Sequence, residues 1–300
     1  MRVAAVETEG GERIVGLMIG DAVLDYSAAL AVYETTAGNR DVQQLRSPMD
    51  IIEHRLWDVK VFERVAELVG KYGLTDHLTV ADGFRLLAPI ARPPAIYALG
   101  RNYPAHARES GKVPPKEPII FGKSPTAVIG PEEPVVYKSW LTRVDPEAEF
   151  AVILRKGGTN VPEDAAMDLV AGYTCLNDVT ARDMQFGDLA AAHPWLRSKG
   201  MDTFCPMGPW IVLPDEIAEP IELDVEMRVN GEVRQKDNTR SMTFNVRQLI
   251  AFISRHITLY PGDVITTGTP EGMKPVVPGD VMEVEVERIG VLRNRVVAEG

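Results

Sequence analysis

The 300-residue sequence predicts a mainly β protein that also contains α-helices, of the α+β class. Beyond residue 95, many short apolar runs alternate with Gly and Pro, which is typical of strands joined by turns. Only a few segments show helical spacing of apolar residues. The Pro-rich stretch 87–94 predicts a linker between a small N-terminal α+β domain, residues 1–92, and a larger domain, residues 93–300. We expect the larger domain to be rolled or closed into a barrel, so that its strand edges are covered.

The N-terminal part has strand patterns before its helical pattern. Residues 3–6, 14–18 and 22–25 are expected to form strands, with a Gly-Gly turn between the first two. Apolar residues in 48–69 recur at helical spacing, which predicts one helix. Ser47 suits the N-cap of that helix and Pro48 its first turn.

The larger part is dominated by short strand patterns. The dipeptide Asn230-Gly231 predicts a tight hairpin, because both positions tolerate positive φ. The segment 101–116 is expected to be a polar loop. The remaining elements that we expect are helices at 162–169 and 246–256 and strands at 96–99, 150–155, 223–229, 232–235, 263–267, 281–286 and 291–297.

The charge and cysteine content restrict the partners and the compartment. The net charge is -11, which argues against nucleic acid and anionic membranes as partners. No apolar run approaches the roughly 20 residues that a membrane span needs, and the N-terminus lacks the pattern of a signal peptide. Cys175 and Cys205 lie in apolar surroundings and are expected to be buried structural thiols. Two isolated cysteines indicate a reducing compartment, so we expect a cytoplasmic protein.

Two glutamates begin one of the predicted strands. Glu147 and Glu149 are two residues apart, so their side chains are expected on one face. Neighbouring carboxylates repel each other, and a divalent cation bound by both would relieve that repulsion. Oxygen ligands favour Mg²⁺, Mn²⁺ or Ca²⁺ over Zn²⁺. A solvent-facing edge strand is the alternative interpretation of this segment taken alone.

A third ligand is expected where another strand ends. Asp178 follows the apolar run that ends at Leu176, at a turn towards a predicted helix. Side chains at strand ends can converge on one site, so Asp178 could complete the metal ligands. The alternative is that Asp178 caps the helix that follows.

Further polar residues suggest acid–base chemistry. His106 and Glu109 are three residues apart and would be neighbours on a helical turn, which suits a base that activates water. A surface ion pair is the alternative. Lys199 and Thr269 could donate to an oxyanion or a carboxylate, although lysines and turn threonines are common in other roles.

Six motifs occur in an order that resembles one known family. They are R-N-Y-x-x-H-x-x-E (101–109), F-x-K-x-P-T (121–126), E-x-E (147–149), D-x-T-A-R-D-x-Q (178–185), K-x-x-D-T-F-C-P-x-G-P (199–209) and T-G-T-P-x-G (267–272). This set, over about residues 96–297, resembles the fumarylacetoacetate hydrolase family. The resemblance implies a catalytic domain of mixed β-roll character and Mg²⁺ or Mn²⁺ as the cofactor, with Ca²⁺ as a further option. Family members are commonly dimers, so a homodimer is expected.

The resemblance also implies roles for individual residues. Glu147, Glu149 and Asp178 fall on the metal ligands, and His106 and Glu109 on a water-activating dyad in a lid segment. Lys199 falls on a catalytic position. The positions expected to bind the substrate are Arg101, Tyr103, Arg182, Gln185, Gln235 and Thr269. The chain departs from the family pattern at 199–202 and at Asp237, which leaves the identity of the substrate open.

The activity that the resemblance implies is metal-dependent cleavage of a C–C bond in a small anionic 2-oxo acid. The expected substrate is an acylpyruvate such as fumarylpyruvate, from the catabolism of aromatic compounds or sugar acids. The same metal site would also suit an isomerase of the 2-hydroxyhepta-2,4-diene-1,7-dioate type or an oxaloacetate decarboxylase. A non-catalytic binding protein, or a protein with a structural Ca²⁺ site, is a further alternative. A non-catalytic protein would be expected to have lost one of the four residues Glu147, Glu149, Asp178 and Lys199, and all are present.

Overall fold

The computed structural model describes residues 1–20, 22–38, 45–81 and 83–300. In the first part of the chain, strands come first and helices follow before a short strand returns. These elements are β1 (Arg2–Glu7), β2 (Arg13–Ile19), β3 (Ala22–Asp25), α1 (Tyr26–Thr36), α2 (Pro48–Glu53), α3 (Val59–Lys71), α4 (Thr75–Leu78) and β4 (Arg85–Leu87).

The larger part of the chain consists mostly of strands, with short helices between them. Its first half contains β5 (Ile96–Gly100), α5 (Pro104–Glu109), β6 (Ile119–Lys123), η1 (Pro125–Ala127), β7 (Val128–Ile129), β8 (Val135–Tyr137), β9 (Val144–Asp145), β10 (Ala148–Leu154), η2 (Glu163–Leu169), β11 (Val170–Asn177), β12 (Thr180–Ala181), α6 (Arg182–Ala190) and α7 (Leu196–Lys199). Its second half contains β13 (Cys205–Val212), η3 (Pro214–Glu216), β14 (Asp224–Val229), β15 (Glu232–Asn238), η4 (Thr239–Ser241), α8 (Val246–His256), β16 (Val264–Thr266), β17 (Val281–Val286) and β18 (Gly290–Ala298).

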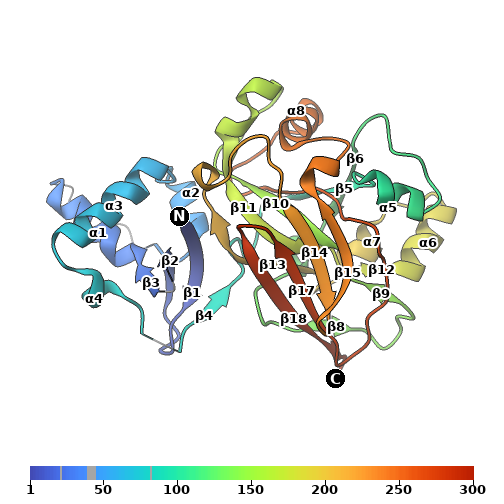
Figure 1. The fold of residues 1–300 in the computed structure, drawn as a ribbon, viewed down its shortest axis with the longest axis horizontal. Helices are drawn as coiled ribbons and strands as arrows, with labels where there is room; N and C mark the ends of the chain where they lie inside the picture. The colour runs from blue at the N-terminus through green and yellow to red at the C-terminus, as the bar shows by residue number, and fades with distance from the viewer. Residues whose placement is uncertain (21, 39–44, 82) are drawn as a thin grey trace.

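Two large sheets organise these strands (Figure 1). Within the described residues, the larger sheet runs β3-β2-β1-β13-β11-β10-β16-β5-β6, with β4 beside β1 and β7 beside β13. The smaller sheet runs β15-β14-β17-β18-β8, and β9 pairs with β12. The prediction of a mainly β fold with helices is confirmed. In the part of the chain that the structure describes, neither sheet path returns to its first strand, so the expected roll is not a closed barrel.

Strand β10 lies near the middle of the larger sheet and is buried on both faces. Its alternating side chains enter two different apolar clusters. Phe150 and Val152 pack in the cluster that also contains residues of the smaller sheet, such as Val225. Ala151 and Ile153 pack in the cluster that contains the N-terminal helices. The period-2 geometry of a strand therefore connects the two layers of the core.

The N-terminal strands belong to the same sheet as the rest of the chain. β1 pairs antiparallel with β13, with Val3 opposite Ile211. In addition, the buried indole N–H of Trp57 donates to the carbonyl oxygen of Ala171 in β11, at 3.0 Å. Hydrogen bonds thus cross from the first part of the chain to the second. The boundary between residues 92 and 93 stays a prediction about which segments fold independently.

The prediction of a single helix over 48–69 is wrong, because the chain forms the two helices α2 and α3 there. Ser47 caps α2 in a capping box with Asp50, and Pro48 lies in its first turn, as predicted. The helix then stops, and Arg55 adopts a left-handed backbone with φ of 59°. The carboxylate of Asp58 accepts from the amide of Lys60 at 2.9 Å and begins α3. This local cap outweighs the continuous helical spacing of the apolar residues.

The other predicted elements agree with the structure in most places. Asn230 and Gly231 have φ of 53° and 80° and join β14 to β15, which confirms the tight hairpin. The expected helix at 162–169 is a 3₁₀ helix, η2, and the expected loop 101–116 begins with helix α5. Helix α1 and strand β13 were not predicted.

Both cysteines are buried, as predicted. Burial raises the pKa of each thiol to about 12, so both remain protonated and unreactive near neutral pH. Among the residues that the structure describes, none of the helices combines the length and the apolar character needed to cross a bilayer.

The Trp57 hydrogen bond predicts a measurable contribution to stability. Replacing Trp57 with Phe leaves the Ala171 carbonyl oxygen without this donor inside the protein. We expect the free energy of unfolding in urea to fall by about 1–3 kcal/mol. Trp140 is 59% exposed and is the matched control, because Trp140→Phe should change stability by less than about 0.5 kcal/mol. Equal effects of the two substitutions would contradict this account.

Candidate active site

The two glutamates of the predicted metal site lie at the start of the buried strand β10. Glu147 directly precedes the strand and Glu149 is its second residue. β10 pairs with β11 on one side and β16 on the other, and both glutamates are buried. The alternative of a solvent-facing edge strand is therefore wrong. A buried pair of carboxylates needs positive charge nearby.

Asp178 reaches the same place from the neighbouring strand. β10 and β11 are antiparallel, with Ala148 opposite Asn177, so the residue after β11 lies beside Glu147. The Asp178 amide donates to the Glu147 carbonyl at 2.9 Å. Asp178 is not the helix cap, because α6 has Ala181 at that position. Glu147, Glu149 and Asp178 each offer a carboxylate oxygen, and these atoms lie within 4.8 Å of one another.

The electrostatics of the three carboxylates suit a bound cation. Burial, followed by the charges of Asp178 and Glu147, raises the pKa of Glu149 well above its usual value. Burial also acts to raise the pKa of Glu147, but Lys199 and Arg182 outweigh it and lower that pKa. The hydrogen-bond donors to Glu149 within the described residues are both neutral, the Thr266 hydroxyl and the Gly268 amide. A buried carboxyl group that makes no ion pair within the described residues, together with an all-oxygen donor set, fits Mg²⁺, Mn²⁺ or Ca²⁺.

Two basic residues from the helical layer contact these carboxylates. Lys199, the last residue of α7, donates to Glu147 at 2.7 Å and to Asp178 at 2.5 Å. Arg182, the first residue of α6, donates to Glu147, and its other nitrogens bond Asp145 at 2.8 Å and Gln185 at 2.6 Å. Burial lowers the pKa of Lys199, but Asp178 and Glu147 outweigh it and raise that pKa. Both side chains are therefore cations beside the acidic cluster.

Sequence reasoning missed two residues of this network. Lys123, at the end of β6, is buried and donates to the other oxygen of Asp178 at 2.6 Å. Asp145, in β9, is buried and holds Arg182 from behind. Lys123 belongs to the F-x-K-x-P-T motif and Asp145 stands two residues before Glu147, so each lies in or next to a motif of the sequence. A lone lysine or aspartate in such a segment is usually solvated, and only the fold shows that these two are buried.

The predicted dyad comes from α5 on another wall of the site. His106 is buried, and its Nδ1 lies 3.4 Å from Glu109, too poorly aligned for a hydrogen bond. The other Glu109 oxygen accepts from the backbone amides of Gly272 and Met273, at 3.0 and 3.1 Å. Burial acts to raise the pKa of Glu109, but the neighbouring His106 ring and the backbone amides of Gly272 and Met273 outweigh it and lower that pKa. Glu109 thus presents a fixed negative charge to the imidazole.

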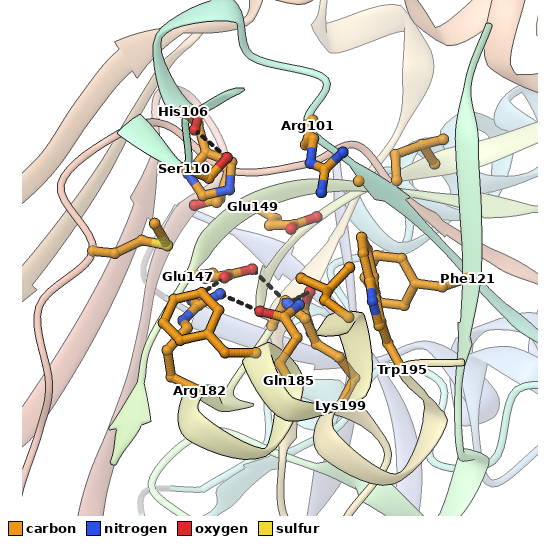
Figure 2. Close-up of a pocket in the computed structure, with 17 residues that line it drawn as sticks. Arg101, His106, Ser110, Phe121, Glu147, Glu149, Arg182, Gln185, Trp195 and Lys199 are labelled. Atoms are coloured by element: carbon orange, nitrogen blue, oxygen red, sulfur yellow. Dashed lines mark hydrogen bonds and ion pairs between the residues drawn. The ribbon is translucent and has the colours of Figure 1, made fainter. Parts of the chain in front are cut away.

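These groups surround one small cavity of about 50 Å³. A single water needs about 10–15 Å³ on this measure, so the cavity suits a molecule of few heavy atoms. In Figure 2, Arg182, Gln185 and Lys199 lie on one side, His106 and Arg101 on the other, and the glutamates between them. The predicted residues that line the cavity are Arg101, His106, Glu147, Glu149, Asp178, Arg182, Gln185, Lys199 and Thr269.

Three predicted residues lie behind the cavity wall. Glu109 contacts His106, as described above. Gln235 accepts from the Ala148 amide at 2.9 Å and donates to the Thr269 hydroxyl at 3.0 Å, so it joins β15 to β10 and to the turn at Thr269. Tyr103 is fully buried, and its hydroxyl has no hydrogen-bond partner among the described residues. Substrate contacts of Tyr103 and Gln235 stay predictions.

Substituting Glu149 with Gln is expected to separate metal binding from folding. Gln keeps the shape but removes one ligand charge, so Mg²⁺ or Mn²⁺ affinity measured by calorimetry should fall by more than about 100-fold. The raised pKa of Glu149 means that the native state binds a proton more tightly than the unfolded chain. The metal-free wild type should therefore lose stability as pH rises above the usual glutamate range, and the variant should not.

Thermal melts of both metal-free proteins at pH 5 and pH 8 would check the sign. We expect Glu149→Gln to be the more stable protein at pH 8, with a smaller difference at pH 5. A variant that still binds the metal like the wild type would show that Glu149 is not a ligand.

Comparison with known proteins agrees with this arrangement. Residues 95–297 match the family described as fumarylacetoacetate (FAA) hydrolase, C-terminal. The chain is 44% identical over 218 residues to a mitochondrial oxaloacetate tautomerase of Bos taurus, covering 70% of this chain and 69% of that protein.

Two solved structures are similar over the full length of both chains. A 5-carboxymethyl-2-hydroxymuconate delta-isomerase from Mycobacterium smegmatis has 34% identity and a TM-score of 0.73, covering 100% of each chain. A maleylpyruvate hydrolase from Sphingobium sp. SYK-6 has 32% identity and a TM-score of 0.75, also covering 100% of each chain. The matched family covers more than half of the sequence and includes every residue of the cavity. This chain therefore belongs to the fumarylacetoacetate hydrolase family.

Proposed function

We propose that the chain is a divalent-metal-dependent tautomerase that interconverts the keto and enol forms of a small 2-oxo acid. The observation that carries the proposal is the arrangement of charge around one cavity. Cations from α6 and α7 lie on one wall, and an imidazole held beside a carboxylate lies on another. The first group suits an anionic substrate, and the second suits proton transfer.

The three carboxylates would hold the metal. Glu147, Glu149 and Asp178 are the residues that we assign to Mg²⁺ or Mn²⁺, which would supply Lewis-acid polarisation of a keto oxygen. The remaining steps use the side chains of this protein. Lys199 and Arg182 place positive charge where negative charge develops on the substrate oxygens, in a site with little water.

His106 is the proposed acid–base group. It would remove a proton from the carbon next to the keto group while the electron pair moves onto the keto oxygen, which then takes up a proton. No atom is gained or lost overall. Glu109 would orient the ring and stabilise its protonated form, because its second oxygen is fixed by two backbone amides. The 44% identity to an oxaloacetate tautomerase supports the same chemistry.

Hydrolysis of a C–C bond in an acylpyruvate such as fumarylpyruvate is the second candidate. It is favoured by the same dyad, because a base beside a carboxylate can act on water as well as on a C–H bond. The similarity to a maleylpyruvate hydrolase supports it. Decarboxylation of oxaloacetate and isomerisation of a dienedioate would use the same cationic wall without water.

Product analysis on a substrate panel separates these reactions. The panel is enol-oxaloacetate, fumarylpyruvate and a 2-hydroxymuconate-type diacid, each with metal-stripped, Mg²⁺-loaded and Mn²⁺-loaded protein. Tautomerisation accelerates loss of enol absorbance and forms no new acid, hydrolysis releases pyruvate with a second acid, and decarboxylation releases CO₂. We expect accelerated enol loss with the loaded protein. Full turnover by the metal-stripped protein would end the proposal.

Variants of the dyad test the assignment of proton transfer. His106→Gln and Glu109→Gln should each lower kcat, with the histidine variant losing about 100-fold or more. Metal affinity should remain within a few-fold of the wild type, because neither residue belongs to the carboxylate cluster. His256→Gln, on the exposed side of α8, is the matched control. Parallel losses of kcat and metal affinity would show instead that His106 holds the metal site together.

A further inference from the structure

Arg101 is a cation on the cavity wall that the acidic cluster does not use. It directly follows β5 and lines the cavity. Among the residues that the structure describes, neither a hydrogen bond nor an ion pair joins its guanidinium to a side chain, whereas Arg182 and Lys199 each contact two carboxylates. In Figure 2, dashed lines join Ser110 to His106 and run among Glu147, Arg182, Gln185 and Lys199, and none reaches Arg101. The charge of Arg101 is therefore available to a ligand.

The backbone around Arg101 is held in an unusual conformation. Its φ is 59°, in the left-handed region that costs a residue with a side chain about 1–2 kcal/mol. Asn102 fixes the next position, because its side chain donates to the Thr267 carbonyl at 2.8 Å and to the Phe244 carbonyl at 3.0 Å. On the other side, a Cβ at Gly100 would lie 3.0 Å from the Trp195 ring. The neighbours thus hold the Arg101 main chain in place, while its guanidinium has no side-chain partner within the described ranges.

The charges that line the cavity also call for more than one anionic group. Three carboxylates line it, and Arg101, Arg182 and Lys199 balance them. A divalent cation bound at the carboxylates would add two positive charges to this lining, which favours a ligand with two anionic groups over a ligand with one. Arg101 lies across the cavity from Arg182 and Lys199, so the positive groups are at two ends (Figure 2).

We infer that Arg101 binds the second carboxylate of a 2-oxo dicarboxylic acid, at the end of the cavity opposite Arg182 and Lys199. The inference rests on the proposed function for the 2-oxo acid end of the ligand. A guanidinium offers a carboxylate two parallel hydrogen bonds, which an ammonium group cannot do. Arg101 is thus a specificity-determining residue that selects dicarboxylic over monocarboxylic 2-oxo acids.

Binding of two matched ligands to the Mg²⁺-loaded protein tests this inference. Oxaloacetate and 2-oxobutyrate differ only in the terminal group, which is a carboxylate in the first and a methyl group in the second. Calorimetry on wild type, Arg101→Asn, Arg101→Lys and Lys112→Asn would give the dissociation constant of each ligand and of Mg²⁺. Asn tolerates the left-handed backbone, so Arg101→Asn should fold. Lys112 is exposed and outside the cavity lining, so its variant controls for loss of one positive charge.

The wild type should bind oxaloacetate at least about 10-fold more tightly than 2-oxobutyrate, as expected for a charge-assisted contact. Arg101→Asn should remove this preference and leave 2-oxobutyrate and Mg²⁺ affinities within about two-fold of the wild type. Arg101→Lys should keep part of the preference, and it remains informative if the asparagine variant does not fold. Equal weakening of both ligands by Arg101→Asn, or an equal effect of Lys112→Asn, would overturn the inference.

The result is distinguishable from failure of the proposed function. A wild type that prefers oxaloacetate but does not accelerate enol loss would leave the Arg101 assignment standing and reject the tautomerase. A wild type that accelerates enol loss but binds oxaloacetate and 2-oxobutyrate equally would support the tautomerase and reject the Arg101 assignment.

Discussion

The burial of three adjacent carboxylates is the constraint on which the site depends. Glu147, Glu149 and Asp178 meet where β10 begins and β11 ends, inside a sheet that is covered on both faces. Charges in such a place interact strongly, because little water is present to screen them. Lys123 and Lys199 must therefore lie close by, and β6 and α7 are the elements that deliver them.

Basic side chains do not compensate the three carboxylates equally. Glu147 and Asp178 each contact basic side chains, whereas the donors to Glu149, in the part of the chain that the structure describes, are a hydroxyl and an amide. A metal ion bound at the three carboxylates would offset the cost of burying Glu149. A buried carboxyl group of this kind lowers the stability of a metal-free protein and raises the affinity of the site for a cation. Phe150 and other apolar residues of β10 pack in the core, and this packing offsets part of the stability cost.

The sequence alone was sufficient for the parts of the site that depend on local geometry. The two-residue spacing of Glu147 and Glu149 places them on one face of any strand, and the structure agrees. Their burial could not be predicted in that way, because β16, which covers one side of β10, lies more than a hundred residues further along the chain. Asp178 had two local interpretations, and the position of Ala181 as the N-cap of α6 decides between them.

Other features depended on contacts between distant segments. The interruption between α2 and α3 goes with the indole of Trp57 reaching β11, and nothing in the spacing of apolar residues indicates that partner. Lys123 was missed because a single lysine in a strand has no periodic signature. Gln235 was placed near the site by motif, but its position behind the wall follows from the pairing of β14 with β15.

The contact between Glu109 and the turn at Gly272 would couple the position of α5 to the protonation chemistry of His106. Two backbone amides hold this carboxylate only while α5 lies against that turn. Any outward swing of α5 that admits a ligand would detach Glu109 and return it to solvent, where its influence on His106 is screened. The imidazole would then lack the partner that prepares it for proton transfer. Proton transfer by His106 would thus be possible only when α5 is packed against the turn at Gly272 and the pocket is closed.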